Sequence, residues 1–320
     1  MKLKGMKFID LFAGIGGFRY AFESFGCECV FSSEWDKFCQ ESYKLNFGDI
    51  PHGDITLIEE KSIPKHDILC AGFPCQPFSV AGSRKGFEDT RGTLFFDVVR
   101  IVSYHKPKLI FLENVKHLKA HNDGATFEVV FNTLNEMGYN VYNKVENAKN
   151  FNLPQNRERI VIVCVRKDID NEKFEFPQFL ESYTTISDIK ESDELTEKYV
   201  IDRLDININK DKLNQAVELG RTKKPLQIGV IGKGGQGNRI YHENGIGITL
   251  TAATGGVGGK TGIFCINGKI RTLSPREASR LQGFPSDFKI INNTNQALKQ
   301  FGNSVPINVL KAIIRQIEKM

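Results

Sequence analysis

The stretch "FIDLFAGIGGF" at residues 8–18 sets out a short apolar strand, a glycine turn and the start of a helix. Glycines at such a turn allow tight turning and close approach of a ligand to the backbone. A dinucleotide fingerprint beginning at Gly14 and Gly16 would need its third glycine where Arg19 stands, and no P-loop GK[ST] follows. Glu34 lies 20 residues beyond Gly14, where an acid can hydrogen-bond ribose hydroxyls. The pattern favours a nucleoside ligand without phosphates, such as S-adenosylmethionine; an ordinary tight turn between strand and helix is the alternative.

Strand-like and helix-like segments alternate through the first half of the chain. Such alternation predicts a mostly parallel sheet with helices on both faces. The strand-like runs are residues 6–12, 27–35, 66–73, 108–115 and 159–166, and the helical ones are residues 16–26, 92–105 and 126–138.

The pattern changes after about residue 180. Residues 181–212 are polar, and 13 of the 29 glycines then fall between Gly229 and Gly268, among short β-like pieces at 228–241 and 245–256. Apolar residues at one helical face follow Pro306 up to the C-terminus. We therefore expect a doubly wound α/β, Rossmann-like domain and a second, smaller β-rich domain.

Composition and charge narrow the class of protein. The formal net charge is +5, and residues 201–269 hold ten Lys/Arg against five Asp/Glu, whereas the rest is balanced at 33 against 33. A basic excess in one segment suits a polyanionic partner, although charged runs usually mark solvated surface. No apolar run approaches the roughly 18 residues that span a bilayer, and no signal peptide is evident, so we expect a cytoplasmic protein. The seven cysteines are scattered without a CxxC pair, which argues against disulfides and a zinc site.

A second informative stretch is "GFPCQPFSVAG" at residues 72–82. Cys75 lies between Pro74 and Pro77, and proline restricts both its own φ and the preceding residue. A stiff loop of this kind fits either a structural cysteine under a tight turn or a thiol held at one approach angle.

The order of motifs along the chain is more specific than any one of them. "DLFAGIGGF", "EWD", "GDIT", "GFPCQPFS", "GTLFFDVVRI", "ENV", "QNRERI", "RTLSPREASRLQGFP" and "QFGNSVPINV" occur in that sequence. The chain resembles the bacterial DNA cytosine-C5 methyltransferases of type II restriction–modification systems, particularly the small HhaI-type enzymes, nearly end to end. The resemblance implies a catalytic, cofactor-binding domain at 1–190, a target-recognition domain at 191–274, and a hinge and C-terminal return at 275–320, with DNA in the cleft between the domains.

The resemblance also implies the catalytic groups. Cys75 matches the nucleophile that adds to C6 of cytosine, because C5 is too poor a nucleophile to take a methyl group unaided. Glu113 in "ENV" matches the carboxyl that holds N3 and the 4-amino group of the base. Arg157 and Arg159 in "QNRERI" match residues that contact the target nucleotide, and their spacing places them on one side of a strand-like segment. Taken without the motif order, Glu113 and the two arginines would read as surface charges.

For the cofactor S-adenosylmethionine, the resemblance points to residues of several motifs. Phe12 and Trp35 would flank the adenine, Glu34 would bind the ribose, and Asp54 would accept from the adenine amino group. Asn303 and Ser304 belong to the last motif, although the pattern alone reads them as a helix N-cap. The full predicted set is Phe12, Gly14, Gly16, Glu34, Trp35, Asp54, Ile55, Pro74, Asn303 and Ser304.

For double-stranded DNA, the matching positions are Gln236, Arg239, Thr249 and Ala81. Gln236 would fill the vacancy left by a flipped base, and Arg239 suits a guanine, whose O6 and N7 it can contact together. The chain departs from the HhaI-type pattern at Ala81, which replaces a serine, and at Ala253, which replaces a tyrosine. These differences put a shared target sequence in doubt. No stable protein partner is implied, and a monomer is expected.

Three alternatives stay open at this point. An RNA cytosine-C5 methyltransferase would use the same catalytic motifs, and a DNA-binding regulator could keep the fold without catalysis. A thiol hydrolase is disfavoured, because no histidine partner is evident near these motifs.

Overall fold

The computed structural model describes residues 1–74, 94–179, 183–252 and 257–320, and of Gln236 the backbone alone. The chain forms two compact units. The first contains Met1–Glu146, Glu158–Pro177 and Leu310–Met320, and the second contains Asn147–Arg157 and Gln178–Val309. The predicted domain limits at residues 190 and 274 do not coincide with these units, and as functional domains they stay predictions. None of the described helices is long and apolar enough to cross a membrane.

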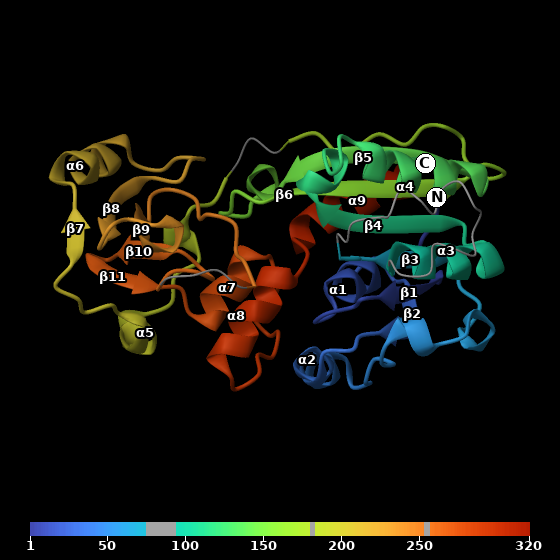
Figure 1. Ribbon diagram of the computed structural model, residues 1–320, viewed down its shortest axis with the longest axis horizontal. Coiled ribbons are helices and arrows are strands. Elements are labelled where there is room, and N and C mark those ends of the chain that lie inside the picture. Colours follow the sequence, from blue (N-terminus) through green and yellow to red (C-terminus); the bar gives the residue numbers. More distant parts are fainter. Residues whose placement is uncertain (75–93, 180–182, 253–256) are drawn as a thin grey trace. The chain divides into compact units, whose positions relative to one another are not determined.

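The first unit is built on a six-stranded sheet in the order β2-β1-β3-β4-β6-β5 (Figure 1). The strands from β1 to β4 pair in parallel, which confirms the predicted parallel sheet, whereas β6 runs antiparallel to β4. The strands are β1 (Lys7–Leu11), β2 (Glu28–Ser33), β3 (Ile68–Ala71), β4 (Leu109–Val115), β5 (Tyr139–Asn147) and β6 (Glu158–Arg166).

Helices cover both faces of this sheet. Phe8 on β1 and Phe111 on β4 contact Phe22 of α1, with ring centroids 5.5 and 5.7 Å apart. The opposite face, which carries Ile9 and Ile110, packs in one apolar cluster with residues of α3 and α4. The helices are α1 (Gly17–Glu23), α2 (Lys37–Phe47), α3 (Leu94–His105), α4 (Ala125–Glu136) and α9 (Ile307–Lys319), of which α9 belongs to this unit from Leu310 on.

The second unit contains a five-stranded sheet in the order β11-β10-β9-β8-β7, as the predicted β-rich module requires. Its core consists of isoleucines on β8, β9 and β10 packed against Ala216 of α6. The elements are β7 (Ile206–Ile208), β8 (Gln227–Ile231), β9 (Arg239–His242), β10 (Ile263–Ile266) and β11 (Lys269–Thr272), with helices α5 (Asp193–Thr196), α6 (Lys210–Leu219), α7 (Pro275–Leu281) and α8 (Thr294–Asn303).

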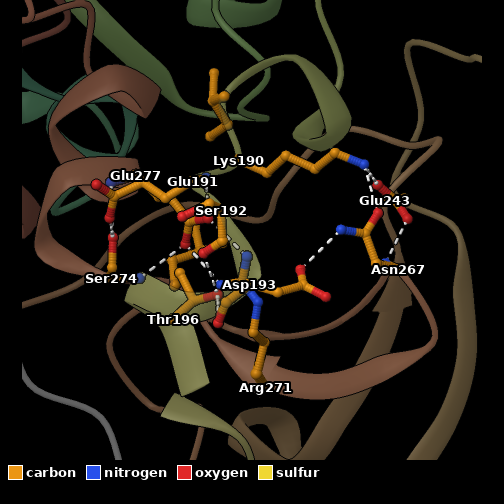
Figure 2. Close-up of polar contacts among 12 residues, drawn as sticks. Lys190, Glu191, Ser192, Asp193, Thr196, Glu243, Asn267, Arg271, Ser274 and Glu277 are labelled. Carbon is orange, nitrogen blue, oxygen red and sulfur yellow. Dashed lines mark hydrogen bonds and ion pairs between the residues drawn. The ribbon is translucent and has the colours of Figure 1, made fainter. Parts of the chain in front are cut away.

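A buried ion pair joins β11 to α7 in this unit (Figure 2). The side chains of Arg271 and Glu277 are 1% and 0% exposed, and two bonds of 2.7 and 2.6 Å join them. The Glu277 carboxylate also accepts the backbone N–H groups of Ser274 and Glu191, each at 2.9 Å. One carboxylate therefore fastens β11, the start of α7 and the chain at residue 191 together.

The sequence-based prediction of secondary structure fails at residues 245–252. The pattern predicts a β-like piece at 245–256, but within the described part of that range the only pairing is an isolated bridge between Gly247 and Gln155. Several elements were also missed. Helices α2, α6 and α8 consist mostly of charged and other polar residues, and β5 is half-buried over most of its length, so none shows the strongly apolar pattern that predicts a helix or a strand.

Candidate active site

The candidate site lies at the carboxyl ends of β1, β2, β3 and β4. The strand order reverses at β1, because the chain proceeds from β1 to β2 on one side and then to β3 on the other (Figure 1). In open α/β sheets the crevice at such a reversal is where ligands bind. The predicted residues Phe12, Glu34 and Glu113 all stand at this edge of the sheet.

The glycine turn between β1 and α1 has a backbone that few other residues would tolerate. Phe12, Gly14 and Gly16 have φ values of 56°, 55° and 83°. A Cβ at Gly16 would lie 2.2 Å from the ring of Phe47 on α2, so glycine is required there. Among the described residues, none has an atom within 4 Å of a Cβ built at Gly14, so the described chain leaves this side of the turn open to a ligand.

Glu34 fixes this turn from the end of β2. Its Oε2 accepts the N–H of Gly14 at 2.8 Å, and its Oε1 accepts the N–H of Asp36 at 2.8 Å. Burial raises the pKa of Glu34, and the backbone hydrogen bonds oppose that rise. Each oxygen keeps a further lone pair, as an acceptor of ribose hydroxyl groups needs. The expected nucleoside site is thus supported by an acid that is held in place before a ligand arrives.

The other predicted cofactor residues in the first unit differ in their exposure and in their contacts. The Trp35 side chain is 78% exposed, so its ring is available to an adenine. Asp54 accepts the backbone N–H and hydroxyl of Thr56 through Oδ1, at 3.0 and 2.8 Å. Ile55 is 3% exposed and contributes packing, while Pro74 is exposed. The exposed ring of Trp35, the carboxylate of Asp54 and a glycine turn without a phosphate-binding fingerprint fit S-adenosylmethionine.

Replacing Glu34 by glutamine should weaken S-adenosylmethionine binding about 10- to 100-fold, because one backbone N–H would face an amide that cannot accept it. Affinity of the unaltered protein should also fall as the pH drops through the raised pKa of Glu34, where a protonated carboxyl loses acceptor capacity. Titration calorimetry measures both. Glu41→Gln, on the exposed side of α2, is the matched control. Equal affinity of the two variants would contradict the assigned role.

Glu113 and Arg159 form the second half of the site. Arg159 is paired in register with Val115, which places it diagonally across from Glu113 on the same face of the sheet. Its Nε lies 3.2 Å from Oε1 of Glu113, and the two side chains are 15% and 11% exposed. The predicted acid is therefore oriented by the predicted arginine, in a largely desolvated setting.

Asn114 is a site residue for which the sequence pattern predicts no role. It is 4% exposed, and its Nδ2 donates to the carbonyl of Phe73 at 2.8 Å. The neighbouring Gly72 lies under Glu113, since a Cβ built there would be 3.9 Å from Oε2. The "ENV" motif thus holds the backbone that leads into Pro74 and Cys75. The sequence signal for this role of Asn114 is its position directly after Glu113.

Cys75 itself lies outside the described residues, as does Ala81. The other cysteines are described, and burial raises the pKa of the Cys70 and Cys164 thiols, both of which are fully buried. Burial also raises the pKa of Cys27 to about 11 and that of Cys29 to about 12. Thiols in such surroundings are poor nucleophiles. Within the described ranges, no His, Cys, Asp and Glu side chains gather as metal ligands would.

Arg157 does not share the position of Arg159. The prediction that both lie on one side of a strand is wrong, because β6 begins at Glu158. Arg157 is 2% exposed and its guanidinium donates to the carbonyls of Leu250, Gly302 and Ser304, at 3.0, 3.1 and 2.7 Å. Its described partners are therefore backbone groups of the second unit.

Asn303 and Ser304 also belong to the second unit. Asn303 is the last residue of α8 and Ser304 is its C-cap. The alternative that they form a helix N-cap is therefore wrong, and their cofactor role stays a prediction.

Three of the four predicted DNA-contacting residues lie on the second, β-rich unit. Arg239 is the exposed first residue of β9 and pairs with Val230 of β8. Gln236 begins the short helical turn Gln236–Asn238 just before it. Thr249 donates its hydroxyl to the carbonyl of Asn156 at 2.6 Å. Ala81 and Ala253 lie outside the described residues, and the structure tests neither departure from the HhaI-type pattern.

The first unit brings Glu34 and the Glu113–Arg159 pair to one edge of a doubly wound sheet, and the second unit is β-rich, as the predicted nucleic-acid methyltransferase requires. The family model for C-5 cytosine-specific DNA methylase matches residues 6–319, and the chain belongs to this family. Type II methyltransferase M.HhaI of Haemophilus parahaemolyticus is 52% identical over 316 residues, which cover 99% of this chain and 95% of that protein. Type II methyltransferase M.HpaII of Haemophilus parainfluenzae is 45% identical, covering 97% and 88%.

Solved structures agree on the fold. The S. pombe Dnmt2 methyltransferase gives a TM-score of 0.71 at 20% identity, covering 98% of both chains. The Entamoeba histolytica methyltransferase EhMeth gives 0.73 at 20% identity with the same coverage. At such identities the likeness shows the fold alone. The family and the curated relatives make the chain a DNA (cytosine-5)-methyltransferase of the restriction–modification kind.

Proposed function

We propose that this enzyme transfers a methyl group from S-adenosylmethionine to C5 of a cytosine that is flipped out of duplex DNA, through a covalent bond between Cys75 and C6. The observation that carries the proposal is the pairing of Glu113 with Arg159 at 3.2 Å, beside the backbone that leads to Cys75 and is held by Asn114. The described backbone before Cys75, the acid and the arginine belong to three separate motifs, and all three lie at one edge of one sheet.

The chemistry requires these groups in this order. The Cys75 thiolate adds to C6, the C5–C6 double bond opens, and Glu113 supplies a proton at N3, so that C5 becomes enamine-like. When bound, S-adenosylmethionine supplies an electrophilic methyl group on a sulfonium, and the carbon–sulfur bond breaks as C5 takes the methyl. Loss of the C5 proton to a base then expels the Cys75 thiolate and restores the double bond, and the proton at N3 returns to the Glu113 carboxylate. Arg159 keeps the Glu113 carboxyl facing one way throughout.

Base flipping follows from the position of the reacting atoms. C5 and C6 of a stacked cytosine cannot be reached by a thiol, so the base must leave the duplex, at a cost of a few kcal/mol. Contacts to DNA phosphates and filling of the vacancy offset that cost. We assign to Gln236 the filling of the space that the flipped base leaves, and to Arg239, at the exposed end of β9, a contact with a base. In the host, such methylation would protect the DNA from cleavage by a partner endonuclease.

The direct test is methylation of genomic DNA by the purified protein with S-adenosylmethionine, followed by bisulfite sequencing. We expect protected cytosines in one short recurring sequence. If the protein binds S-adenosylmethionine and yet protects no cytosine, the proposal is wrong, and the same assay on tRNA would then examine the RNA alternative.

Arg239→Ala should reduce discrimination at a single guanine of the recognition sequence by about 1–3 kcal/mol, since a bidentate base contact would be lost. Methylation rates on the cognate duplex and on duplexes with one changed base pair measure this. Arg203→Ala is the control, because Arg203 is exposed and ion-paired with Asp205. A uniform loss on all sequences would instead make Arg239 a phosphate contact.

A further inference from the structure

Residues 247–252 are held firmly, although they form no strand in the part of the chain that the structure describes. The N–H of Gly247 donates to the carbonyl of Pro154 at 2.6 Å, and the N–H of Asn156 donates to the carbonyl of Gly247 at 2.9 Å. The hydroxyl of Thr249 continues this ladder to the carbonyl of Asn156. The segment thus runs beside residues 154–157, in parallel.

At Leu250 the backbone hydrogen bonds of the segment are made to side chains instead of to a neighbouring backbone. The N–H of Leu250 donates to Oε1 of Gln155 at 2.9 Å, and its carbonyl accepts from Nη1 of Arg157 at 3.0 Å. Gln155 is 0% exposed and Arg157 is 2% exposed. Two side chains, two residues apart, therefore satisfy both backbone polar groups of one residue, Leu250, where a neighbouring strand would otherwise do so.

Helix α8 closes the other side of the segment. A Cβ at Gly302 would lie 2.5 Å from the carbonyl carbon and oxygen of Thr251 and 2.8 Å from the N of Ala252. Arg157 reaches across to the same place, since its Nη2 donates to the carbonyls of Gly302 and Ser304. The guanidinium therefore spans residue 250 on one branch and the end of α8 on the other, all within the second unit.

The geometry points to Arg157 as a positioning residue rather than a substrate contact: with Gln155 and Gly302 it forms a clamp that sets the backbone at Leu250–Ala252. The inference rests on the proposed function in one respect, since the clamped backbone directly follows Thr249, the proposed DNA contact. Lysine cannot replace this arginine, because a single ammonium group lacks the planar fork that serves separate acceptors. Glycine is required at 302 because any side chain there would displace the segment.

Hydrogen–deuterium exchange of the protein alone tests the clamp. In Arg157→Lys and in Gly302→Ala, amides in the peptide covering residues 247–252 should exchange at least about tenfold faster, because each change loosens a contact that closes the segment. Gly53→Ala is the matched control, since a Cβ there would lie within 4 Å of no atom in the part of the chain that the structure describes. Alanine is the better helix former, so faster exchange in Gly302→Ala would not reflect a weakened α8.

The functional arm uses both single variants and the double variant. If they act through one segment, each should lower the ratio of methylation rates on cognate and one-base-changed duplexes, and the double variant should lose no more than the worse single. Unchanged exchange in Arg157→Lys together with abolished methyl transfer would overturn the inference and make Arg157 a substrate contact. A double variant whose loss in this rate ratio equals the product of the two single-variant losses would also contradict the inference. A wild type that methylates no cytosine would refute the proposed function while the exchange result still stood.

Discussion

Replacing Glu113 by glutamine should lower the methyl-transfer rate by about 10²- to 10⁴-fold, the usual contribution of a positioned general acid. Glutamine keeps the shape of the side chain and can still accept from Arg159, whose Nε lies 3.2 Å from Oε1. It can also still hydrogen-bond the cytosine. What it cannot do is deliver a proton to N3 as the Cys75 sulfur adds to C6.

Single-turnover kinetics on duplex DNA that carries the recognition sequence measure this loss, with cofactor binding checked separately by calorimetry. Glu158→Gln is the control, because Glu158 is a neighbouring carboxylate whose ion pair with Lys116 is exposed. A Glu113→Gln variant with the wild-type rate and intact binding would remove Glu113 from the chemistry.

Replacing Glu277 by leucine should lower the free energy of unfolding by about 3–5 kcal/mol, as expected when one partner of a buried ion pair is removed. The change leaves the Arg271 guanidinium, 1% exposed, without its carboxylate. It also removes the acceptor for the backbone N–H groups of Ser274 and Glu191 (Figure 2). Equilibrium denaturation in urea measures the loss.

The double variant Arg271→Met/Glu277→Leu separates the causes. Removing both charges should recover part of the lost stability, because two apolar side chains leave no unpaired charge in the interior. Recovery should stay incomplete, since the two backbone donors still lack an acceptor. Asp205→Asn, in an exposed ion pair with Arg203, should leave stability nearly unchanged. If Glu277→Leu behaved like Asp205→Asn, the buried pair would not stabilise the second unit.

The parts of the site that were predictable depend on local pattern. The glycine turn and Glu34 follow from their spacing after two strands, and the structure joins them with a 2.8 Å hydrogen bond. Glu113 stands at the end of an apolar strand-like run that the structure confirms as β4. In each case short-range sequence order fixes which edge of the sheet a residue reaches.

The parts that were missed depend on contacts between distant segments. Arg157 and Arg159 alternate in sequence like residues of one strand, yet Arg157 lies before β6 and binds carbonyls more than 90 positions away. Residues 248–251 alternate like a strand, yet side chains of Gln155 and Arg157 replace the strand neighbour. No local pattern reveals that Gly302 must leave room for a peptide bond at Thr251.

The covalent step through Cys75 is the centre of this account, and a 5-fluorocytosine target tests it most directly. Fluorine at C5 blocks the final elimination, so a duplex bearing 5-fluorocytosine in the recognition sequence, with S-adenosylmethionine, should trap the enzyme on the DNA. We expect a stable protein–DNA adduct whose peptide map places the bond at Cys75. No adduct, or an adduct at Cys70 or Cys164, would contradict the account.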